Sequence, residues 1–557
     1  MNNELKIYCK NTEEYIPMDG GDTLLHLYET IKPRIGVEAL CAMVNNKCED
    51  LRYPVYGPKH VEFVGLSHPF GERAYVRSLC MVLYKAVRDV FPGRRLRIEH
   101  SISGGFYCKL KHEKENVTPA AVEAIKARMH EIVEQDITFL RRERLTTDVI
   151  EMFRQQGLND KVRLLSTVHD LYTVYYKLDD LIDSFYGPLV PSTGLLRVFD
   201  LKPFEEGMLL LPPSRTQPDK PAQLVPMPKM FKAFTDYVAF NDIIGVDDVG
   251  SLNKATHHKY APLLISVAEA LHDKVFNNIA QEIASRFHAG GARVVLIAGP
   301  SSSGKTTSSK RLAIQLLTNY IRPKVIELDN YFVNRDQTPR DETGDYDYES
   351  LYALDLQQFN TDLADLIAGK EVNMPTYNFA SGQREYRGNT LKLAENEILL
   401  IEGIHGLNPE LTKQIPEKLK FRLYVSALTT LSIDDHNWVS TTDNRLLRRI
   451  IRDAKYRGST AKDTIARWPS VRRGELKWIF PYQENADATF NSSLLFELAV
   501  MRQHAEPLLK QVPANTPEYA EANRLLRFLS YFEPLAEKDI PGVSLLREFL
   551  GGSTFIY

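Results

Sequence analysis

The stretch "ARVVLIAGPSSSGKTTSSKRLAIQLL", residues 292–317, decides the fold of the second half of the chain. Its apolar opening is typical of a buried strand, and the segment that follows Lys305 has the pattern of a helix. Between them, residues 299–306 match the phosphate-loop pattern G-x-x-x-x-G-K-[ST] without deviation. The alternative is a chance turn rich in glycine and serine, but the flanking strand and helix favour a working loop.

In such a loop the backbone N–H groups curl around phosphate oxygens, the lysine reaches the terminal phosphates and the threonine holds Mg²⁺. We therefore predict ATP or GTP binding together with Mg²⁺, and leave the choice between the two nucleotides open. The predicted nucleotide-binding residues are Gly299, Pro300, Ser301, Ser302, Ser303, Gly304, Lys305, Thr306 and Thr307.

Strand and helix patterns alternate from this loop to about residue 512, which predicts an α/β domain with a mostly parallel sheet. Upstream, residues 1–65 read as short strands around one helix, a β-grasp-like module. Residues 66–210 mix helices and strands, and 211–290 begin with a proline-rich linker and become helical. We expect five parts: 1–65, 66–210, a connector at 211–290, the α/β domain at 291–512 and a helical tail at 513–557.

The bulk composition excludes several classes of protein. Of 557 residues, 43% are hydrophobic and 25% charged, and the net charge of −3 predicts no strong overall attraction to nucleic acid or membrane. No apolar run approaches the ~20 residues that span a bilayer. Five cysteines without a CxxC pair are typical of reduced thiols, so we expect a cytoplasmic protein without structural zinc.

Two strands of the α/β domain end in acids. Asp329 follows the strand pattern "VIEL" and could accept a proton from an attacking hydroxyl, although a helix-capping or Mg²⁺-water role is the alternative. Glu402 ends the strand "EILLIE", where an acid can hold Mg²⁺ through water. Both acids would lie at the edge of the sheet that carries the phosphate loop.

The segment "RRIIRDAKYRG", residues 448–458, clusters arginines at helical spacing. Arg449, Arg452 and Arg457 could neutralise charge on a transferring phosphoryl group. A solvated basic helix face is the alternative, which the phosphate loop upstream disfavours.

The ordered motifs "GPSSSGKTT", "LDNYF", "YESLYALD", "GKEVNMPTYNF", "LLIEGIHGL" and "RRIIRDAKYRG" resemble those of the uridine–cytidine kinase and phosphoribulokinase family, over residues 292 to about 510. The resemblance implies transfer of the ATP γ-phosphoryl to the 5′-hydroxyl of a nucleoside. It implies Asp329 as the base, with Lys305, Arg449, Arg452 and Arg457 as further catalytic residues, and Thr306 and Glu402 at the metal. The implied substrate residues are Asp329, Tyr348, Glu349, Tyr377 and Arg449, with Asp347 as a competitor of Glu349 for the ribose hydroxyls.

This sequence departs from the family pattern at two positions. Gly382 stands where the family usually has a histidine, five residues after Tyr377, which removes a hydrogen-bonding and stacking group from the nucleobase pocket. Ser459 replaces an arginine often found two positions past Arg457. We therefore expect the transfer chemistry to be retained and leave the acceptor open between a nucleoside and another sugar-bearing alcohol.

Residues 1–210 resemble the N-terminal portion of threonyl-tRNA synthetase, a TGS-like β-grasp module followed by an editing domain. The segments "ISGGFYCKL" and "YGPLVPSTGLLRVFDL" carry the likeness. The family's HxxxH and CxxxH metal pairs fall on Arg77 and Met81, and on Phe185 and Leu189. None of these side chains replaces an imidazole or thiolate ligand, so we expect no editing activity.

The N-terminal half could bind an RNA, a nucleotide or a partner, or serve only as a scaffold. The basic clusters "RRLR" (94–97) and "RRERL" (141–145) are the hint of RNA contact, with solvated faces as the favoured alternative. We predict an ATP- and Mg²⁺-dependent nucleoside kinase that acts on a small molecule and forms a homo-oligomer. A regulator that binds RNA or a partner under nucleotide control is the alternative from another class.

Overall fold

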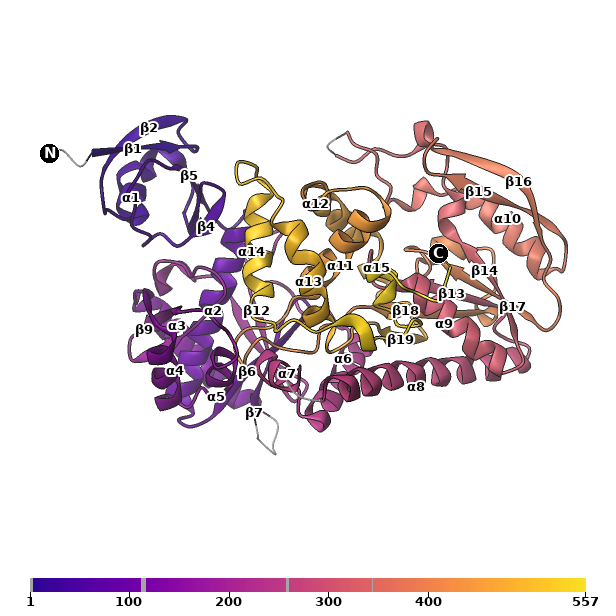
Figure 1. Cartoon of the computed structure of the whole chain (residues 1–557), viewed down its shortest axis with the longest axis horizontal. Coiled ribbons are helices and arrows are strands. Elements are labelled where there is room, and N and C mark those ends of the chain that lie inside the picture. Colours follow the sequence, from indigo (N-terminus) through magenta and orange to yellow (C-terminus); the bar gives the residue numbers. More distant parts are fainter. Residues whose placement is uncertain (1–3, 112–116, 257–259, 343, 557) are drawn as a thin grey trace.

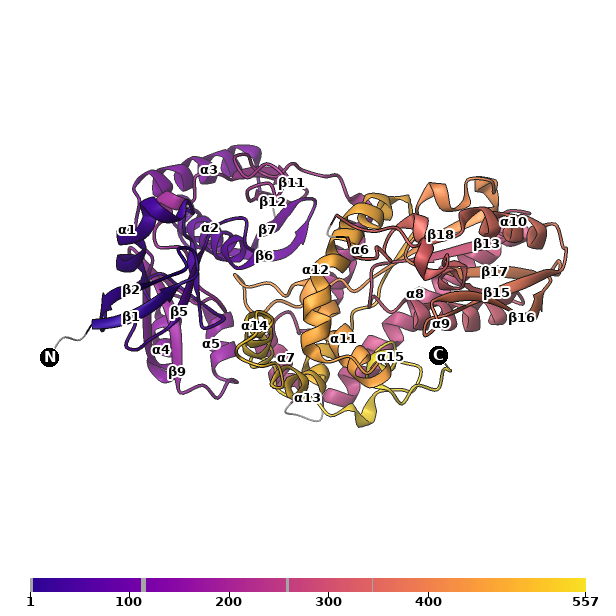
Figure 2. The same cartoon turned by 90° about the horizontal axis from the view of Figure 1, so that it is seen from above.

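The computed structural model describes residues 4–111, 117–256, 260–342 and 344–556. Its N-terminal half and its kinase-like half lie at opposite ends of an elongated molecule, with the last helices between them (Figures 1 and 2). Within the described residues, no helix combines the length and apolar character needed to cross a membrane.

The first module is a five-stranded sheet of order β2-β1-β5-β3-β4 with one helix packed on it. Its apolar residues, among them Ile7, Leu24 and Phe63, form a core of their own. The elements are β1 Glu4–Cys9, β2 Glu14–Asp19, α1 Leu24–Ile35, β3 Cys41–Val44, β4 Lys47–Glu49 and β5 His60–Val64.

The second region packs two antiparallel sheets, of order β10-β9-β8 and β11-β12-β7-β6, around the long helix α2. Almost every residue of α2 from Ala74 to Val87 is buried, so this helix forms the centre of the region. The elements are α2 Pro69–Val90, β6 Arg95–Ile102, β7 Gly105–Lys111, α3 Pro119–Glu134, β8 Leu140–Leu145, α4 Thr146–Gln155, α5 Asn159–Leu165, β9 Tyr172–Leu178, β10 Leu181–Asp183, β11 Asp200–Phe204 and β12 Gly207–Leu211.

Three helices connect the halves: α6 Pro228–Ile244, α7 Val249–Thr256 and α8 Ala261–His288. The 28 residues of α8 span about 42 Å at 1.5 Å per residue, and this helix runs along the lower side of Figure 1 into the kinase-like half. There Phe276, Ile279 and Ile283 pack behind the parallel sheet.

The kinase-like half is built on a five-stranded, all-parallel sheet of order β14-β17-β13-β18-β19. Alternate residues of each strand enter one of two cores: Val295 and Ile297 face α8 and α9, whereas Val294 and Leu296 face α10. The predicted α/β class with a parallel sheet is therefore confirmed.

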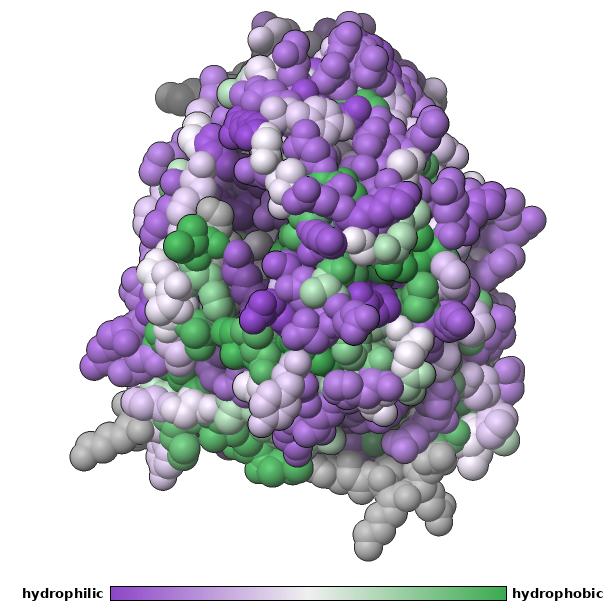
Figure 3. All heavy atoms as spheres, turned by 90° about the vertical axis from the view of Figure 1, so that its right-hand side faces the viewer, coloured by the Kyte–Doolittle hydropathy of each residue, from purple (hydrophilic) through white to green (hydrophobic). Residues whose placement is uncertain are grey.

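The elements of this half and of the tail are β13 Val294–Ala298, α9 Lys305–Thr318, β14 Arg322–Glu327, α10 Leu356–Ile367, β15 Val372–Asn378, β16 Gln383–Leu391, β17 Glu397–Glu402, β18 Lys420–Ser426, α11 Thr441–Tyr456, α12 Ala461–Trp478, β19 Ala488–Asn491, α13 Glu497–Leu509, α14 Tyr519–Leu529 and α15 Arg547–Leu550. The end of the molecule that this half forms is covered by hydrophilic side chains with apolar patches between them (Figure 3). The predicted homo-oligomer remains a prediction.

The two halves share hydrophobic cores. Leu164 and Tyr186 of the N-terminal half lie in one cluster with residues of α11, α13 and α14. Ile102 and Tyr107 lie in another with Leu407 of the kinase-like half. The five-part division stays a prediction, and the two halves pack against each other through these shared clusters.

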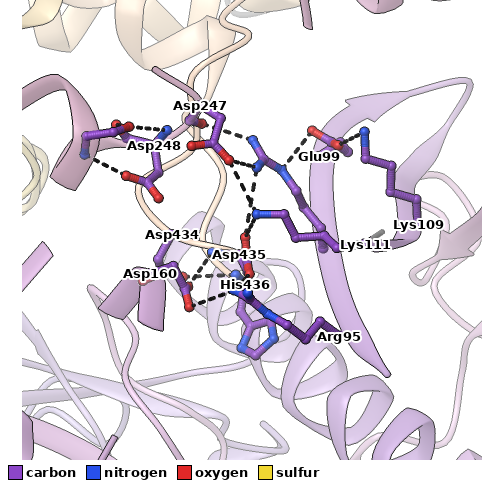
Figure 4. A network of polar contacts seen from close by, with 12 residues as sticks. Arg95, Glu99, Lys109, Lys111, Asp160, Asp247, Asp248, Asp434, Asp435 and His436 are labelled. Atoms are coloured by element: carbon purple, nitrogen blue, oxygen red, sulfur yellow. Dashed lines mark hydrogen bonds and ion pairs between the residues drawn. The ribbon is translucent and has the colours of Figure 1, made fainter. Parts of the chain in front are cut away.

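A buried ionic network closes the same junction (Figure 4). Arg95 contacts Asp435 at 2.6 Å, Arg97 contacts Asp247 at 2.7 Å, and Lys111 contacts Asp435 at 2.9 Å. Arg97 is 2% exposed. Arg97 is therefore neither a solvated nor an RNA-facing side chain, whereas Arg95, whose side chain is 34% exposed, pairs with Asp435 of the kinase-like half.

Candidate active site

The phosphate loop connects the fully buried strand β13 to the helix α9. Gly304 has φ = 86°, in the left-handed region that favours glycine. A Cβ on Gly299 would lie 2.1 Å from the carbonyl oxygen of Val425, so a side chain cannot fit there. The two glycines of the motif are thus required by the turn itself.

Thr306 and Glu402 meet at the edge of the sheet. The strand register pairs Ile297 with Glu402, and the Thr306 hydroxyl donates to the Glu402 carboxylate at 3.1 Å. Burial raises the pKa of Glu402 to about 7, with Lys305 opposing and Asp329 adding to the shift. The Thr306 hydroxyl and the Glu402 carboxylate are oxygen ligands of the kind that Mg²⁺ prefers. Among the described residues, no group of three or more His, Cys, Asp or Glu side chains could hold a metal without further ligands.

Asp329 lies in the 3₁₀ turn Leu328–Tyr331, directly after β14. Its side chain is exposed to solvent, yet the surrounding protein raises its pKa, an effect opposed by Lys305, Arg457 and Arg452. The predicted base thus stands near the phosphate-loop lysine and two of the predicted arginines.

Glu349 faces the same charges. Burial raises the pKa of Glu349 to about 7, Glu475 raises it further and Arg449 opposes the shift. Its Oε2 atom is buried and has no hydrogen-bond partner among the described residues. Asp347 instead accepts the backbone N–H of Glu349 at 3.2 Å. Glu349 and Asp347 both remain candidates for the ribose hydroxyls.

The three predicted arginines converge on Asp453, which the sequence analysis did not single out. Arg449, Arg452 and Arg457 approach its carboxylate at 3.3, 2.8 and 3.7 Å. Arg449 also donates to the Ser301 hydroxyl of the phosphate loop at 2.8 Å. Burial lowers the pKa of Arg449, and the Asp453 carboxylate opposes that shift.

Two further arginines of α11 support the phosphate loop from beneath. Arg445 and Arg448 are 1% and 0% exposed and each pairs with a buried glutamate. They donate to the backbone carbonyls of Ser301 and Ser302 at 3.1 and 3.4 Å. The helical spacing of arginines in "NRLLRRIIR" is the signal that could have identified them, because it places them on one face of the helix.

Aromatic rings line the side of the site beyond Asp329. The Tyr377 ring lies 5.5 Å from Phe332 and 5.1 Å from Phe379, and Tyr348 is half-exposed nearby. Burial raises the pKa of Tyr377, with Arg335 opposing and Tyr348 adding to the shift, so all three side chains are close in space. A planar ring could stack on this wall.

Arg335 fills the space that a side chain at position 382 would need. A Cβ on Gly382 would lie 2.7 Å from the Arg335 Nε atom, and Gly382 has φ = 71°. Arg335 also donates to the Phe379 carbonyl at 2.7 Å. A guanidinium, which only donates hydrogen bonds, therefore occupies the space beside Gly382.

In the N-terminal half, the four positions that match the editing domain's metal pairs are buried. Met81, Phe185 and Leu189 are at most 3% exposed and share one apolar cluster. The buried Arg77 guanidinium lies over the Tyr186 ring at 4.9 Å. The loop 434–438 of the kinase-like half reaches this place, where the His436 ring contacts Asp183 at 2.7 Å.

Comparison with known proteins separates the same two halves of the chain. Residues 294–495 match the model of the phosphoribulokinase / uridine kinase family. The chain is 33% identical over 182 residues to the threonine–tRNA ligase of Desulforamulus reducens, which covers 32% of this chain and 28% of the relative. It is 29% identical over 201 residues to that of Carboxydothermus hydrogenoformans, covering 36% and 30%. The chain thus spans less than a third of the length of these ligases.

Two solved structures are also similar. A possible uridine kinase from Bacillus stearothermophilus is 21% identical and covers 36% of this chain and 89% of its own, with a TM-score of 0.23. A putative fructose transport system kinase from Silicibacter sp. TM1040 is 18% identical and covers 39% and 98%, with a TM-score of 0.28.

The predicted pairing of a kinase-like region with a threonyl-tRNA-synthetase-like region is confirmed by the family match and the ligase relatives. The chain thus joins a region similar to the phosphoribulokinase / uridine kinase family to a region similar to threonine–tRNA ligases.

Proposed function

We propose that the protein transfers the γ-phosphoryl group of ATP to the 5′-hydroxyl of a nucleoside. The observation that carries the proposal is the position of Asp329, whose accessible carboxyl shares one charged site with Lys305 and the arginines of α11. A nucleotide switch has no need of a base that faces a second ligand.

In the proposed reaction, Asp329 accepts the proton of the acceptor hydroxyl as the oxygen forms a bond to the γ-phosphorus. The bond from that phosphorus to the β–γ bridging oxygen breaks, and its electron pair leaves with ADP. Lys305, Arg452 and Arg457 stabilise the negative charge on the transferring group. Thr306 and Glu402 would hold Mg²⁺, which supplies neutralisation of phosphate charge.

The raised pKa of Asp329 suits a base, because a more basic carboxylate accepts a proton more readily. Glu349, with an unpartnered buried oxygen, would accept hydrogen bonds from the ribose hydroxyls. The wall of Tyr377, Phe332 and Phe379 would stack on the nucleobase.

A kinase of another sugar-bearing alcohol is the second candidate. The Arg335 side chain, which fills the space beside Gly382, favours this second candidate. Its guanidinium could bind an anionic or carbonyl-bearing group of a sugar, so the site does not require a nucleobase.

The test is ADP release by the full chain with ATP and Mg²⁺ against a panel of nucleosides and sugar alcohols. Asp329→Asn should lower turnover by about 10²- to 10⁴-fold, the usual contribution of a general base, with little change in ATP affinity. Asp365→Asn, an exposed acid paired with Lys370 on the surface, is the matched control.

Nucleoside-dependent release that Asp329→Asn abolishes would support both acceptor and base. Release with sugar alcohols alone would move the proposal to the second candidate. Turnover of Asp329→Asn within tenfold of wild type would remove the base assignment. Tight ATP binding without turnover on any acceptor would favour a nucleotide-controlled binder of RNA or a partner.

A further inference from the structure

The C-terminal segment, residues 541–556, packs on the phosphate loop although it lies outside the family match at 294–495. Leu545 is fully buried in the core behind β13. A Cβ on Gly304 of the phosphate loop would lie 3.0 Å from a methyl group of Leu545. The short helix α15 lies beside α11 in both ribbon views (Figures 1 and 2).

Two interactions fix this segment to the arginine-bearing helix α11. The Arg448 guanidinium lies over the Phe549 ring at 5.1 Å. Lys455 donates to the Leu550 carbonyl at 2.5 Å. Because Leu545 is held before residue 548 and Phe549 and Leu550 are held after it, the Glu548 side chain has a defined direction.

That side chain points at the phosphate loop. The Glu548 Oε2 atom accepts the backbone N–H of Thr307 at 3.1 Å and the Thr307 hydroxyl at 2.6 Å. Glu548 is also close enough to the metal-site acid Glu402 to raise the pKa of that group, after burial and Asp329. An acidic side chain of the tail therefore reaches the donor end of the site.

Thr307 lies in the first turn of α9, where backbone N–H groups have no partner within the helix. In a phosphate loop these N–H groups and the adjoining hydroxyl receive the anionic oxygens of the nucleotide. A carboxylate oxygen is the same kind of acceptor, so Glu548 and a nucleotide phosphate require the same two donors. A phosphate bound at these donors would also be repelled by the negative charge of Glu548.

We propose that Glu548 is an internal competitor of the nucleotide: its carboxylate occupies the Thr307 donors in the nucleotide-free protein and must leave when a phosphate binds. The apparent affinity for the nucleotide then equals the intrinsic affinity multiplied by the fraction of time that Glu548 does not hold Thr307. The inference rests on phosphate binding by the loop and is independent of which acceptor is phosphorylated.

The test measures binding of Mg²⁺-ATP and of Mg²⁺-tripolyphosphate to the full chain by titration calorimetry, without any acceptor. Glu548→Gln removes the charge, and Glu548→Asp keeps the charge but shortens its reach. Both should bind each ligand more tightly, by about tenfold if the carboxylate occupies the loop about nine-tenths of the time. Asp539→Asn, an exposed acid of the same tail, is the matched control.

Unchanged or weaker ATP binding by both variants, with wild-type melting temperatures, would overturn the proposal, because Glu548 would then be neutral or helpful to the nucleotide. A gain for ATP without a gain for tripolyphosphate would also overturn it, since the carboxylate would then act on the base or ribose. Because no acceptor is present, failure of the nucleoside assay cannot produce either outcome.

Discussion

Replacing Lys161 with methionine tests whether the two halves unfold as one unit. The Lys161 side chain is 1% exposed and lies between two carboxylates, Asp183 of the N-terminal half at 2.8 Å and Asp434 of the kinase-like half at 2.9 Å. Methionine fills similar space but leaves both carboxylates without their cation. Removing one partner of a buried ion pair costs about 3–5 kcal/mol of the free energy of unfolding.

The assay uses the positions of the three tryptophans, Trp438, Trp468 and Trp478, all in the kinase-like half. Trp438 contacts Phe106 at the junction, with ring centroids 4.5 Å apart, so it is replaced by phenylalanine. Fluorescence then reports on α12 alone, while circular dichroism reports on the whole chain. In urea titrations, Lys161→Met should move both curves together to lower concentration.

Lys177→Met is the matched control, because Lys177 is exposed on β9, and such surface changes usually stay within about 0.5 kcal/mol. The reasoning fails if the fluorescence midpoint of Lys161→Met equals that of its parent while circular dichroism shows an earlier transition. The halves would then unfold separately and the junction would not carry stability between them.

Three more outcomes follow from the site and its surroundings. Burial raises the pKa of Glu402 to about 7, so Mg²⁺ binding in the presence of ADP should release close to one proton below pH 7 and little at about pH 8. Calorimetry in buffers of different ionisation enthalpy measures the number of protons released, and Glu402→Gln should abolish the release. Gly382→His should cost about 1–3 kcal/mol in urea unfolding, and Arg335→Ala in the same chain should recover part of it by making room. Burial raises the pKa of Asp247, but the neighbouring cations Arg97 and Lys111 outweigh this effect and lower it to about 2. The ionised carboxylate therefore stabilises the fold above about pH 4, the pKa in the unfolded chain, and this stabilisation is lost as the pH falls toward 2. Asp247→Asn should flatten the dependence of the unfolding free energy on pH in this range.

Local patterns predicted the sheet and the chemical centre of the site. The apolar runs of β13 and β17 are buried on both faces, which is the signature of a parallel sheet, and each carries the phosphate loop or Glu402 at its carboxyl end. Asp329 followed from the same rule. These features depend on residues close together in sequence, so periodicity and motif spacing were sufficient.

The rest depends on contacts between distant residues. Arg95 and Asp435 are 340 positions apart, so the basic cluster of the N-terminal half could not be assigned to an internal interface. Glu548 meets Thr307 across 241 positions, and the tail has no motif that indicates a binding role. Arg448 was not recognised as buried because the sequence does not show the glutamate that compensates its charge.

The loop 434–438 also closes the place in the ligase-like region where the editing-domain pattern has its metal pairs. Arg77→His, Met81→His, Phe185→Cys and Leu189→His would together supply that pattern's ligand types, yet they would not open a site. The His436 ring lies tilted against Tyr84 with ring centroids 4.1 Å apart, and Trp438 packs on the cluster that contains Met81. Each of these substitutions would disturb a closed core before any metal could compensate for it. Single substitutions at these positions should therefore cost stability without creating a metal site.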